Sequence, residues 1–425
     1  MIINGKLSII MVLTTLLRVI LTRSFKPFIF NNTYTNQHDY ANLENLGLYV
    51  HIPFCRSICD FCPYNKVIYD EQLSMQYKEA LLAEIELVAT GHDKKQVTSL
   101  YFGGGSPALM LDDLKDIIDC IKKYYDIKDG IGVELHPDDI NEDMLMTLKY
   151  AGVSMLSIGV QSFNEACLDN LGRKQSDAVN KLKYAKAAGF ETIDVDLIFA
   201  IPGQNEIIIR NDIETAFNHG ATQISTYPFI DFTFADNKYK PMPEKTKKKM
   251  LFAIAKFIKF AEKQRTSIWT FAEKGTQKYS SITRHNFLGF GTSATTLLKN
   301  EFKINTFSIP AYFERLKNKQ LPTSLTLNFT KRQRACYYLF WSAYSMRLNK
   351  VQFENMFETP IKRMFGIELW FCEKLGFICN KNDDYFLTDK GAYFYHYIEQ
   401  AYTTAYIDKT WNISRLQAFP EKIQL

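Results

Sequence analysis

Between residues 46 and 272, short β-rich runs alternate six times with amphipathic helical runs, and few folds are compatible with this alternation. We expect strands at 46–52, 97–102, 131–136, 154–160, 192–199, 222–229 and 267–272. Helices are expected near 71–90, 111–126, 140–151, 164–188, 207–219 and 243–264. Strands that alternate with helices form parallel sheets, and runs that are apolar on both faces are typical of strands covered by helices. The sequence therefore predicts an α/β fold, a partial (β/α)6 barrel of the TIM-like kind.

Two further segments flank this core in the chain of 425 residues. We expect three parts: a hydrophobic or amphipathic segment and linker over 1–45, the core over 46–300, and an accessory domain over 301–425. In the last part, helices are followed by a short hairpin, "GFICNKNDDYFLTDKG", which predicts a mainly α-helical, winged-helix-like module. Its candidate recognition helix, "PIKRMFGIELWFCEKLG", is mixed in charge and mostly apolar, so we expect no nucleic-acid binding.

The N-terminal run "LSIIMVLTTLLRVIL", residues 7–21, leaves three alternatives open. It is shorter than the roughly 18 uninterrupted apolar residues expected of a spanning helix, and no small-residue cleavage site follows it. The run can be a helix packed on the body of the protein, an interfacial membrane anchor formed by 1–23, or a true signal or span. We expect a cytoplasmic protein, with membrane association through this segment as the alternative.

Composition excludes several classes of protein. Apolar residues make up 46% and charged residues 23% of the chain, which leaves no room for a long disordered region. The net charge is only +5, and the one dense basic run, 245–249, is typical of a solvated helix face. Eight cysteines in a chain of this length do not form a disulfide scaffold, so the sequence indicates a reducing compartment. Five of them are expected to be small buried hydrophobic residues: Cys120, Cys167, Cys336, Cys372 and Cys379.

The other three cysteines lie within eight residues of the run "HIPFCRSICDFCPYNK". Cys55, Cys59 and Cys62 are too close together for comfortable disulfide pairing. Thiolates are soft ligands that suit zinc or iron–sulfur clusters, and three of them leave one coordination position open. His51 could complete a closed zinc site, whereas an iron–sulfur cube would keep one iron free for a substrate or cofactor.

Residues capable of chemistry recur where the predicted strands end. The three cysteines follow the first strand and "GGGSP" (103–107) follows the second. Glu134 lies in the third strand, Gln161 ends the fourth and Asp196 lies late in the fifth. Ligand groups collect at the carboxyl ends of the strands in parallel α/β folds. The sequence therefore predicts an active site at one rim of the barrel.

The motifs "YVHIPFCxxxCxFC", "YFGGGSP", "VELHP", "IGVQSF" and "DLIFAIPGQ" carry a resemblance in their order and spacing. The chain resembles the radical S-adenosylmethionine (SAM) superfamily and, more narrowly, the oxygen-independent coproporphyrinogen III oxidase and heme-chaperone family. The resemblance covers about residues 46–300 and extends more weakly to 400. It implies a 4Fe–4S cluster on Cys55, Cys59 and Cys62, with SAM on the open iron. One electron, from a donor such as flavodoxin or ferredoxin, would cleave SAM to a 5′-deoxyadenosyl radical that abstracts hydrogen from the substrate.

The resemblance also implies residues around SAM. They are Tyr49, Phe61, Gly103, Gly104, Gly105, Ser106, Glu134, Gln161, Arg173 and Asp196. The glycines would let the backbone approach the methionine amino group, and the Lys–Ser/Thr ending of a phosphate-binding loop is missing. Glu134 would accept hydrogen bonds from the ribose, and Phe61 would pack on adenine. The others would line the cofactor cavity, in which members of the family hold one SAM or two.

The sequence departs from its relatives at two motifs. Tyr64 stands where coproporphyrinogen oxidases of the family carry a further cysteine, and the segment before the first strand is shorter than theirs. The heme chaperones are marked by His-Asn followed by Tyr-Trp, and here His285 and Asn286 lack the second pair. We therefore expect a radical SAM enzyme, related to the oxidoreductases of porphyrin biosynthesis, with an unidentified small-molecule substrate of which a tetrapyrrole is one candidate. The alternatives are a heme chaperone of the same fold and a SAM-dependent radical methyltransferase.

Overall fold

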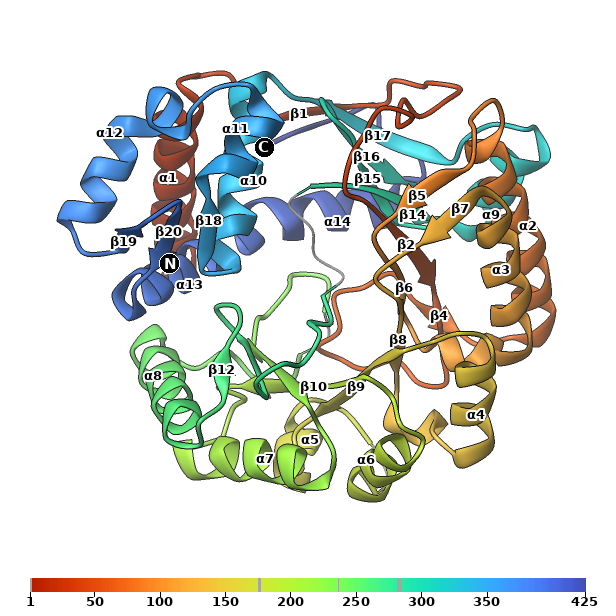
Figure 1. Ribbon diagram of the computed structural model, residues 1–425, viewed down its shortest axis with the longest axis horizontal. Coiled ribbons are helices and arrows are strands. Elements are labelled where there is room, and N and C mark those ends of the chain that lie inside the picture. The colour runs from red at the N-terminus through yellow and green to blue at the C-terminus, as the bar shows by residue number, and fades with distance from the viewer. Residues whose placement is uncertain (1, 175–176, 236, 281–284) are drawn as a thin grey trace.

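A computed structural model describes residues 2–174, 177–235, 237–280 and 285–425, and one large curved sheet organises it (Figure 1). Six of its strands run parallel and lie side by side in chain order. They are β2 (Leu46–Ile52), β6 (Leu100–Gly104), β8 (Ile131–Leu135), β9 (Met155–Gln161), β10 (Thr192–Phe199) and β11 (Gln223–Pro228). The predicted partial (β/α)6 barrel is confirmed.

The helices that follow these strands cover the outer face of the sheet (Figure 1). They are α2 (Glu71–Ala89), α3 (Leu111–Tyr124), α4 (Glu142–Tyr150), α5 (Glu165–Asn170), α6 (Ala178–Ala187), α7 (Glu206–His219) and α8 (Glu244–Phe260). Five of the helices begin at an Asp or Asn whose side chain accepts a hydrogen bond from a backbone N–H of the first turn, which stabilises the helix start. These caps are Asp70, Asn141, Asn164, Asp177 and Asn205.

Two predicted strands differ from the observed ones. The run 97–102 divides, because β5 (Lys95–Val97) pairs with β7 (Tyr125–Ile127) outside the main sheet. The run 267–272 contributes only β13 (Thr270–Ala272), which is antiparallel to β11. It forms a hairpin with β12 (Gln264–Arg265), and a short turn can only join antiparallel strands.

The sheet also continues past β2. β14 (Asn286–Phe290) pairs parallel with β2, and the strands beyond it are antiparallel. They are β15 (Thr295–Leu297), β16 (Glu301–Asn305), β17 (Thr323–Asn328), β1 (Ile29–Asn31) and β21 (Lys422–Gln424), with α9 (Ile309–Lys317) before β17. The predicted boundary at 300 lies in the β15–β16 hairpin. The sheet crosses that boundary, and β1 and β21 bring both ends of the chain into it.

The remaining C-terminal residues form the predicted winged-helix-like module. Its helices are α10 (Lys331–Tyr344), α11 (Lys350–Phe357) and α12 (Ile361–Lys374), and its small sheet is β18 (Arg347–Asn349), β20 (Asp384–Leu387) and β19 (Ile378–Lys381). α13 (Asp389–Tyr402) continues through a π-helical turn (Thr403–Ile407) into α14 (Asp408–Leu416). A separate aromatic core that includes Tyr338, Phe353 and Phe365 holds the module together.

The N-terminal hydrophobic run forms α1 (Ile2–Thr22), which packs against α10, α13 and the π-helical turn. The side chain of Arg332 donates to the Leu21 carbonyl oxygen at 2.6 Å, and Arg23 pairs with Glu368 at 2.7 Å. Of the three alternatives, these contacts match the helix packed on the body of the protein. The side chains of residues 7–11 lie outside the described residues. No helix among the described residues combines the length and apolarity needed to cross a membrane.

Candidate functional site

Residues 53–66, here called the cluster loop, leave the sheet at the carboxyl end of β2. The short strands β3 (Phe54–Cys55) and β4 (Val67–Ile68) close the loop at its base. The Val67 N–H donates to the Pro53 carbonyl oxygen at 2.8 Å, and the Tyr69 N–H donates to that of Cys55 at 2.9 Å. The loop therefore starts and ends at the same point of the rim, and it carries the three cysteines at the carboxyl end of β2.

The three thiols of the cluster loop influence one another. Burial, and then the neighbouring thiols of Cys62 and Cys59, raise the pKa of the Cys55 thiol to about 12. Burial also raises the pKa of the Cys59 thiol, against the opposing charge of Arg173. Three thiolates crowded together would repel one another, whereas a bound cationic centre deprotonates coordinating thiols and offsets the repulsion. The donor set therefore fits a thiolate-bound cluster.

The alternative zinc site requires a ring nitrogen of His51. The Nε2 atom lies 2.9 Å from the carbonyl oxygen of Asn65, and the Nδ1 atom lies 3.2 Å from the Tyr49 hydroxyl. Burial lowers the pKa of His51 to about 4, so the ring is neutral. Among the residues that the structure describes, no three His, Cys, Asp or Glu side chains surround a position for a single ion. Since both His51 nitrogens already have partners, the geometry favours an open cluster over a closed zinc site.

The glycine-rich motif at 103–107, here called the Gly loop, lies directly against the cluster loop. The Gly105 N–H donates to the Ile52 carbonyl oxygen and the Ser106 N–H to that of Phe54, both at 2.7 Å. A Cβ atom on Gly105 would stand 2.2 Å from the Phe54 carbonyl oxygen. Gly104 adopts a φ of +113°, which favours glycine. Contacts within the protein therefore require these glycines, a reason that the sequence did not reveal.

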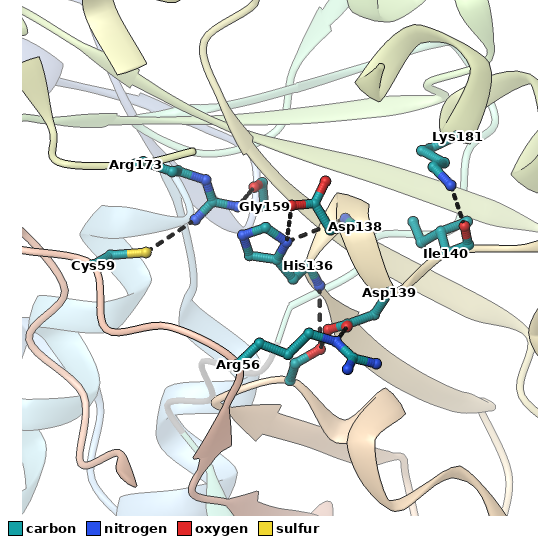
Figure 2. A network of polar contacts seen from close by, with 10 residues as sticks. Arg56, Cys59, His136, Asp138, Asp139, Ile140, Gly159, Arg173 and Lys181 are labelled. Carbon is teal, nitrogen blue, oxygen red and sulfur yellow. Dashed lines mark hydrogen bonds and ion pairs between the residues drawn. The ribbon is translucent and has the colours of Figure 1, made fainter. Parts of the chain in front are cut away.

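A buried carboxylate joins the two loops (Figure 2). Asp139, in the turn after β8, accepts a hydrogen bond from the Ser106 hydroxyl at 2.5 Å and another from the Arg56 guanidinium. The side chain of Asp139 is 3% exposed and that of Arg56 is 67% exposed. Sequence reasoning missed both residues, because nothing in "VELHPDD" distinguishes Asp139 from Asp138.

Arg173 lies beside Cys59 of the cluster loop. Its guanidinium donates to the Cys59 sulfur at 3.7 Å and to the Gly159 carbonyl oxygen (Figure 2). The next residues of its motif, 175–176, lie outside the described ones. His136 is its neighbour in Figure 2, and burial followed by the charge of Arg173 lowers the pKa of that imidazole to about 4. The positive charge next to the thiols therefore comes from Arg173 at Cys59 and from Lys66, whose charge acts on both Cys55 and Cys59.

Two of the predicted acids face each other inside the barrel. Glu134 accepts a hydrogen bond from the Gly104 N–H at 3.1 Å, and burial followed by the charge of Asp196 raises its pKa to about 7. Burial raises the pKa of Asp196 to about 6, although the Ser157 hydroxyl donates to it at 2.9 Å. A further carboxyl that the sequence did not single out, Asp194, has a raised pKa because of burial and Asp196. At neutral pH this group therefore holds protons and can donate as well as accept hydrogen bonds.

The other predicted cofactor residues occupy the same rim. Burial and the charge of Glu134 raise the pKa of the Tyr49 hydroxyl, which places Tyr49 beside that acid. Gln161 ends β9 with a φ of +69°, a left-handed conformation rare for a side-chain-bearing residue. Phe61 packs on an apolar cluster at the ends of β10 and β11 that includes Ile198 and Phe229. Contacts of these residues with SAM remain predictions.

A cavity of about 1030 Å³ extends from the rim to α1, α10 and α13. Tyr49, Tyr64 and Glu134 line its rim side. Most of the other lining residues are aliphatic or aromatic. The charged residues that line it are Arg18, Asp129, Glu134, Lys278 and Glu368. The chain is 14% aromatic, and many of its aromatic residues are concentrated in the lining of this cavity.

The His-Asn pair has a structural role at the start of β14. The His285 ring packs edge-on against Tyr338, with ring centroids 5.7 Å apart, and its carbonyl oxygen accepts a hydrogen bond from Arg334 at 2.5 Å. The Asn286 amide donates to the Glu44 carbonyl oxygen at 3.1 Å. These contacts connect β14 to α10 and to the segment before β2.

Comparison with known proteins gives consistent matches. The family model of the radical SAM superfamily matches residues 49–216. The heme chaperone HemW of Bacillus subtilis (strain 168) is 26% identical over 361 residues, which covers 81% of this chain and 95% of that protein. The oxygen-independent coproporphyrinogen III oxidase of Synechocystis sp. is 25% identical over 330 residues, 71% of this chain and 70% of that protein. The structure of coproporphyrinogen III oxidase (HemN) from Escherichia coli, a radical SAM enzyme, has the same fold, with a TM-score of 0.75 and 21% identity, and the match covers 91% of this chain and 98% of that one.

Proposed function

This chain belongs to the radical SAM superfamily, in the family of the heme chaperones and oxygen-independent coproporphyrinogen III oxidases, and on that premise we propose that it is a heme-chaperone-like protein with a radical SAM site. Membership implies a 4Fe–4S cluster and SAM. We also propose which residues hold the cluster and SAM, and that the cavity binds a hydrophobic tetrapyrrole of low charge.

In this proposal Cys55, Cys59 and Cys62 hold the cluster, whose chemistry when bound is the one-electron cleavage of SAM. Arg173 donates to the Cys59 sulfur, and hydrogen bonds to cluster sulfurs raise the reduction potential. Asp139 keeps the Gly loop against the cluster loop. The partly protonated carboxyls of the rim can bind the hydroxyl groups of a cofactor.

The choice between the two tetrapyrrole ligands rests on the low positive charge of the cavity. Among the described residues that line it, the cations are Arg18 and Lys278, against three acids. Coproporphyrinogen III bears four carboxylates, and burying a carboxylate without a partner costs several kcal/mol. Heme bears two propionates on a flat apolar ring that can lie against aromatic side chains. The low positive charge and the aromatic lining of the cavity therefore support heme over coproporphyrinogen.

Titration with heme and with coproporphyrin III tests this proposal on the anaerobic, cluster-loaded protein. We expect heme to bind close to one per chain and coproporphyrin III to bind more weakly. Ile398→Trp, which adds bulk inside the cavity, should weaken heme binding, whereas Val351→Trp on the exposed face of α11 should not. Tighter binding of coproporphyrin, or decarboxylation of coproporphyrinogen with SAM and a reductant, would favour the oxidase instead.

A second candidate is a radical enzyme with another hydrophobic substrate, including a methyl acceptor. The contact of Arg173 with the Cys59 sulfur favours it, because a protein that only carried heme would not need this part of the site. Incubation with SAM and reduced flavodoxin or ferredoxin should then release 5′-deoxyadenosine, and Cys59→Ala should release none. Transfer of a methyl group from SAM would identify the methyltransferase alternative. Release of 5′-deoxyadenosine only in the absence of heme would distinguish the enzyme from the heme chaperone.

A further inference from the structure

The outward face of α1 is apolar and has no partner within the described chain. Val12, Leu16 and Ile20 are 65%, 54% and 41% exposed, and their spacing of four residues places them on one side of the helix. Phe25, just after the helix, is 89% exposed. An apolar stripe of this length marks a surface that meets something other than water.

The inward face of the same helix closes the cavity. Leu17 and Leu21 line the cavity, while Thr14 and Thr22 are buried. α1 is therefore apolar on both sides, with the cavity behind it and an unpartnered stripe in front. A helix with this pattern suits the interface between a bilayer and water.

A second exposed apolar surface stands beside α1. On α12 and just after it, four large apolar side chains are between 51% and 63% exposed. They are Ile367, Trp370, Phe371 and Leu375. Arg332 bridges the two helices, because it donates to the Leu21 carbonyl oxygen at 2.6 Å and pairs with Glu368 of α12 at 3.0 Å.

The charges around these surfaces are complementary to anionic lipids. Residues 1–38 contain four basic residues and no acidic one, and the first acid of the chain is Asp39. α12 adds Lys362, Arg363 and Lys374 against the acids Glu368 and Glu373, and Glu368 is already paired with Arg23 and Arg332. Basic residues next to an apolar face are attracted to an anionic membrane surface, at about 1 kcal/mol each.

We propose that these two surfaces, Val12, Leu16, Ile20 and Phe25 together with Ile367, Trp370, Phe371 and Leu375, form a lipid face that docks on an anionic bilayer. Docking places α1 between the bilayer and the cavity. The ligand of the cavity is then a hydrophobic molecule of low charge that reaches it from the membrane. That last step rests on the proposed function, whereas the docking itself does not.

Flotation with vesicles tests the docking. The full chain should bind vesicles of phosphatidylcholine with phosphatidylglycerol, and bind phosphatidylcholine alone more weakly. The variant V12Q/L16Q/I20Q should lose about tenfold or more of this partitioning, since each change removes an apolar side chain from the lipid face. The matched control M75Q/M146Q/I207Q changes three equally exposed apolar residues on α2, α4 and α7 and should bind like the wild type.

Quenching by brominated lipid tests the orientation. Trp370 fluorescence, taken as the difference between the wild type and Trp370→Phe, should fall when brominated phosphatidylcholine is included in the vesicles. Cys59→Ala, which lacks the cluster, should dock and be quenched as the wild type is, so a failure of docking is distinct from a failure of the radical chemistry. Equal binding by V12Q/L16Q/I20Q, no quenching of Trp370, or dimers in place of vesicle binding would each overturn the proposal.

Discussion

Replacing Asp139 with asparagine should loosen the contact between the cluster loop and the Gly loop. The carboxylate accepts from the Ser106 hydroxyl and from the Arg56 guanidinium, so it joins segments about 50 residues apart in sequence (Figure 2). Asparagine keeps one acceptor oxygen but turns an NH2 group toward one of the two donors. Hydrogen bonds that involve a charged group contribute about 1.5–3 kcal/mol, while an exposed ion pair contributes about 1 kcal/mol or less.

The burial of the two partners sets the order of effects. Because Asp139 is almost fully buried and Arg56 is mostly exposed, the Ser106 bond carries most of the energy. Asp139→Asn should therefore destabilise the ordered arrangement of the two loops by about 1–3 kcal/mol, which corresponds to a roughly 5- to 150-fold weaker affinity for SAM if the loops must be ordered to bind it. Arg56→Gln should weaken SAM binding by about fivefold or less.

Calorimetric titration of SAM into the anaerobic, cluster-loaded proteins measures both effects, with iron and sulfide content as the check that each variant holds its cluster. Unchanged SAM affinity in Asp139→Asn at full iron content would refute the reasoning. An effect of Arg56→Gln as large as that of Asp139→Asn would refute the assignment of the energy to the buried bond.

Three other changes test separate parts of the structure. Burial raises the pKa of Glu84 from 4.5 to about 7, so its stabilising contribution is complete below pH 4.5 and is lost as the pH rises through 7. Urea unfolding should show wild-type stability falling by about 2–3 kcal/mol relative to Glu84→Gln between pH 5 and 8, and parallel pH curves would contradict this. Arg173→Lys keeps the charge but loses the planar fork, so redox titration should show a cluster potential lower by roughly tens of millivolts; an unchanged potential would contradict the bond to Cys59. Gly105→Ala should abolish SAM binding because its Cβ would overlap a backbone carbonyl, whereas Gly366→Ala, with no atom within 4 Å, should have no effect.

The core of the fold could be predicted because its signals are local. Six apolar strands alternate with capped helices, and the order of strands follows the order of the chain. The extension from β14 to β21 could not be predicted in this way. Its strands are short, and β1 and β21 pair with each other although they lie at opposite ends of the sequence. Such pairing depends on the three-dimensional position of the rest of the folded sheet, which local sequence patterns do not give.

The residues of the candidate site also divide into those that local sequence signals predict and those that only the folded structure reveals. The cysteines, the Gly loop and Glu134 stand at strand ends, where a topological rule places them together. Asp139 and Asp194 could not be identified, because each accepts a hydrogen bond from a partner on another segment, Ser106 for Asp139 and Ser225 of β11 for Asp194. The purpose of Gly105 was also hidden, since only the folded chain shows the Phe54 carbonyl oxygen in the space of its missing side chain.

The departure at Tyr64 has a structural meaning once the C-terminal helices are in place. Arg415 of α14 donates to the carbonyl oxygens of Pro63 and Tyr64 at 2.6 and 2.9 Å, and the Tyr64 ring lies 6.0 Å from that of Trp411 on the same helix. Tyr64 and Trp411 both line the cavity. Since the cluster loop ends against a helix that also contacts the ligand space, position 64 belongs to the cavity rather than to the metal site. An aromatic ring there extends the apolar wall, so we infer that the missing cysteine affects what the cavity accepts and not the proposed ligand set of Cys55, Cys59 and Cys62.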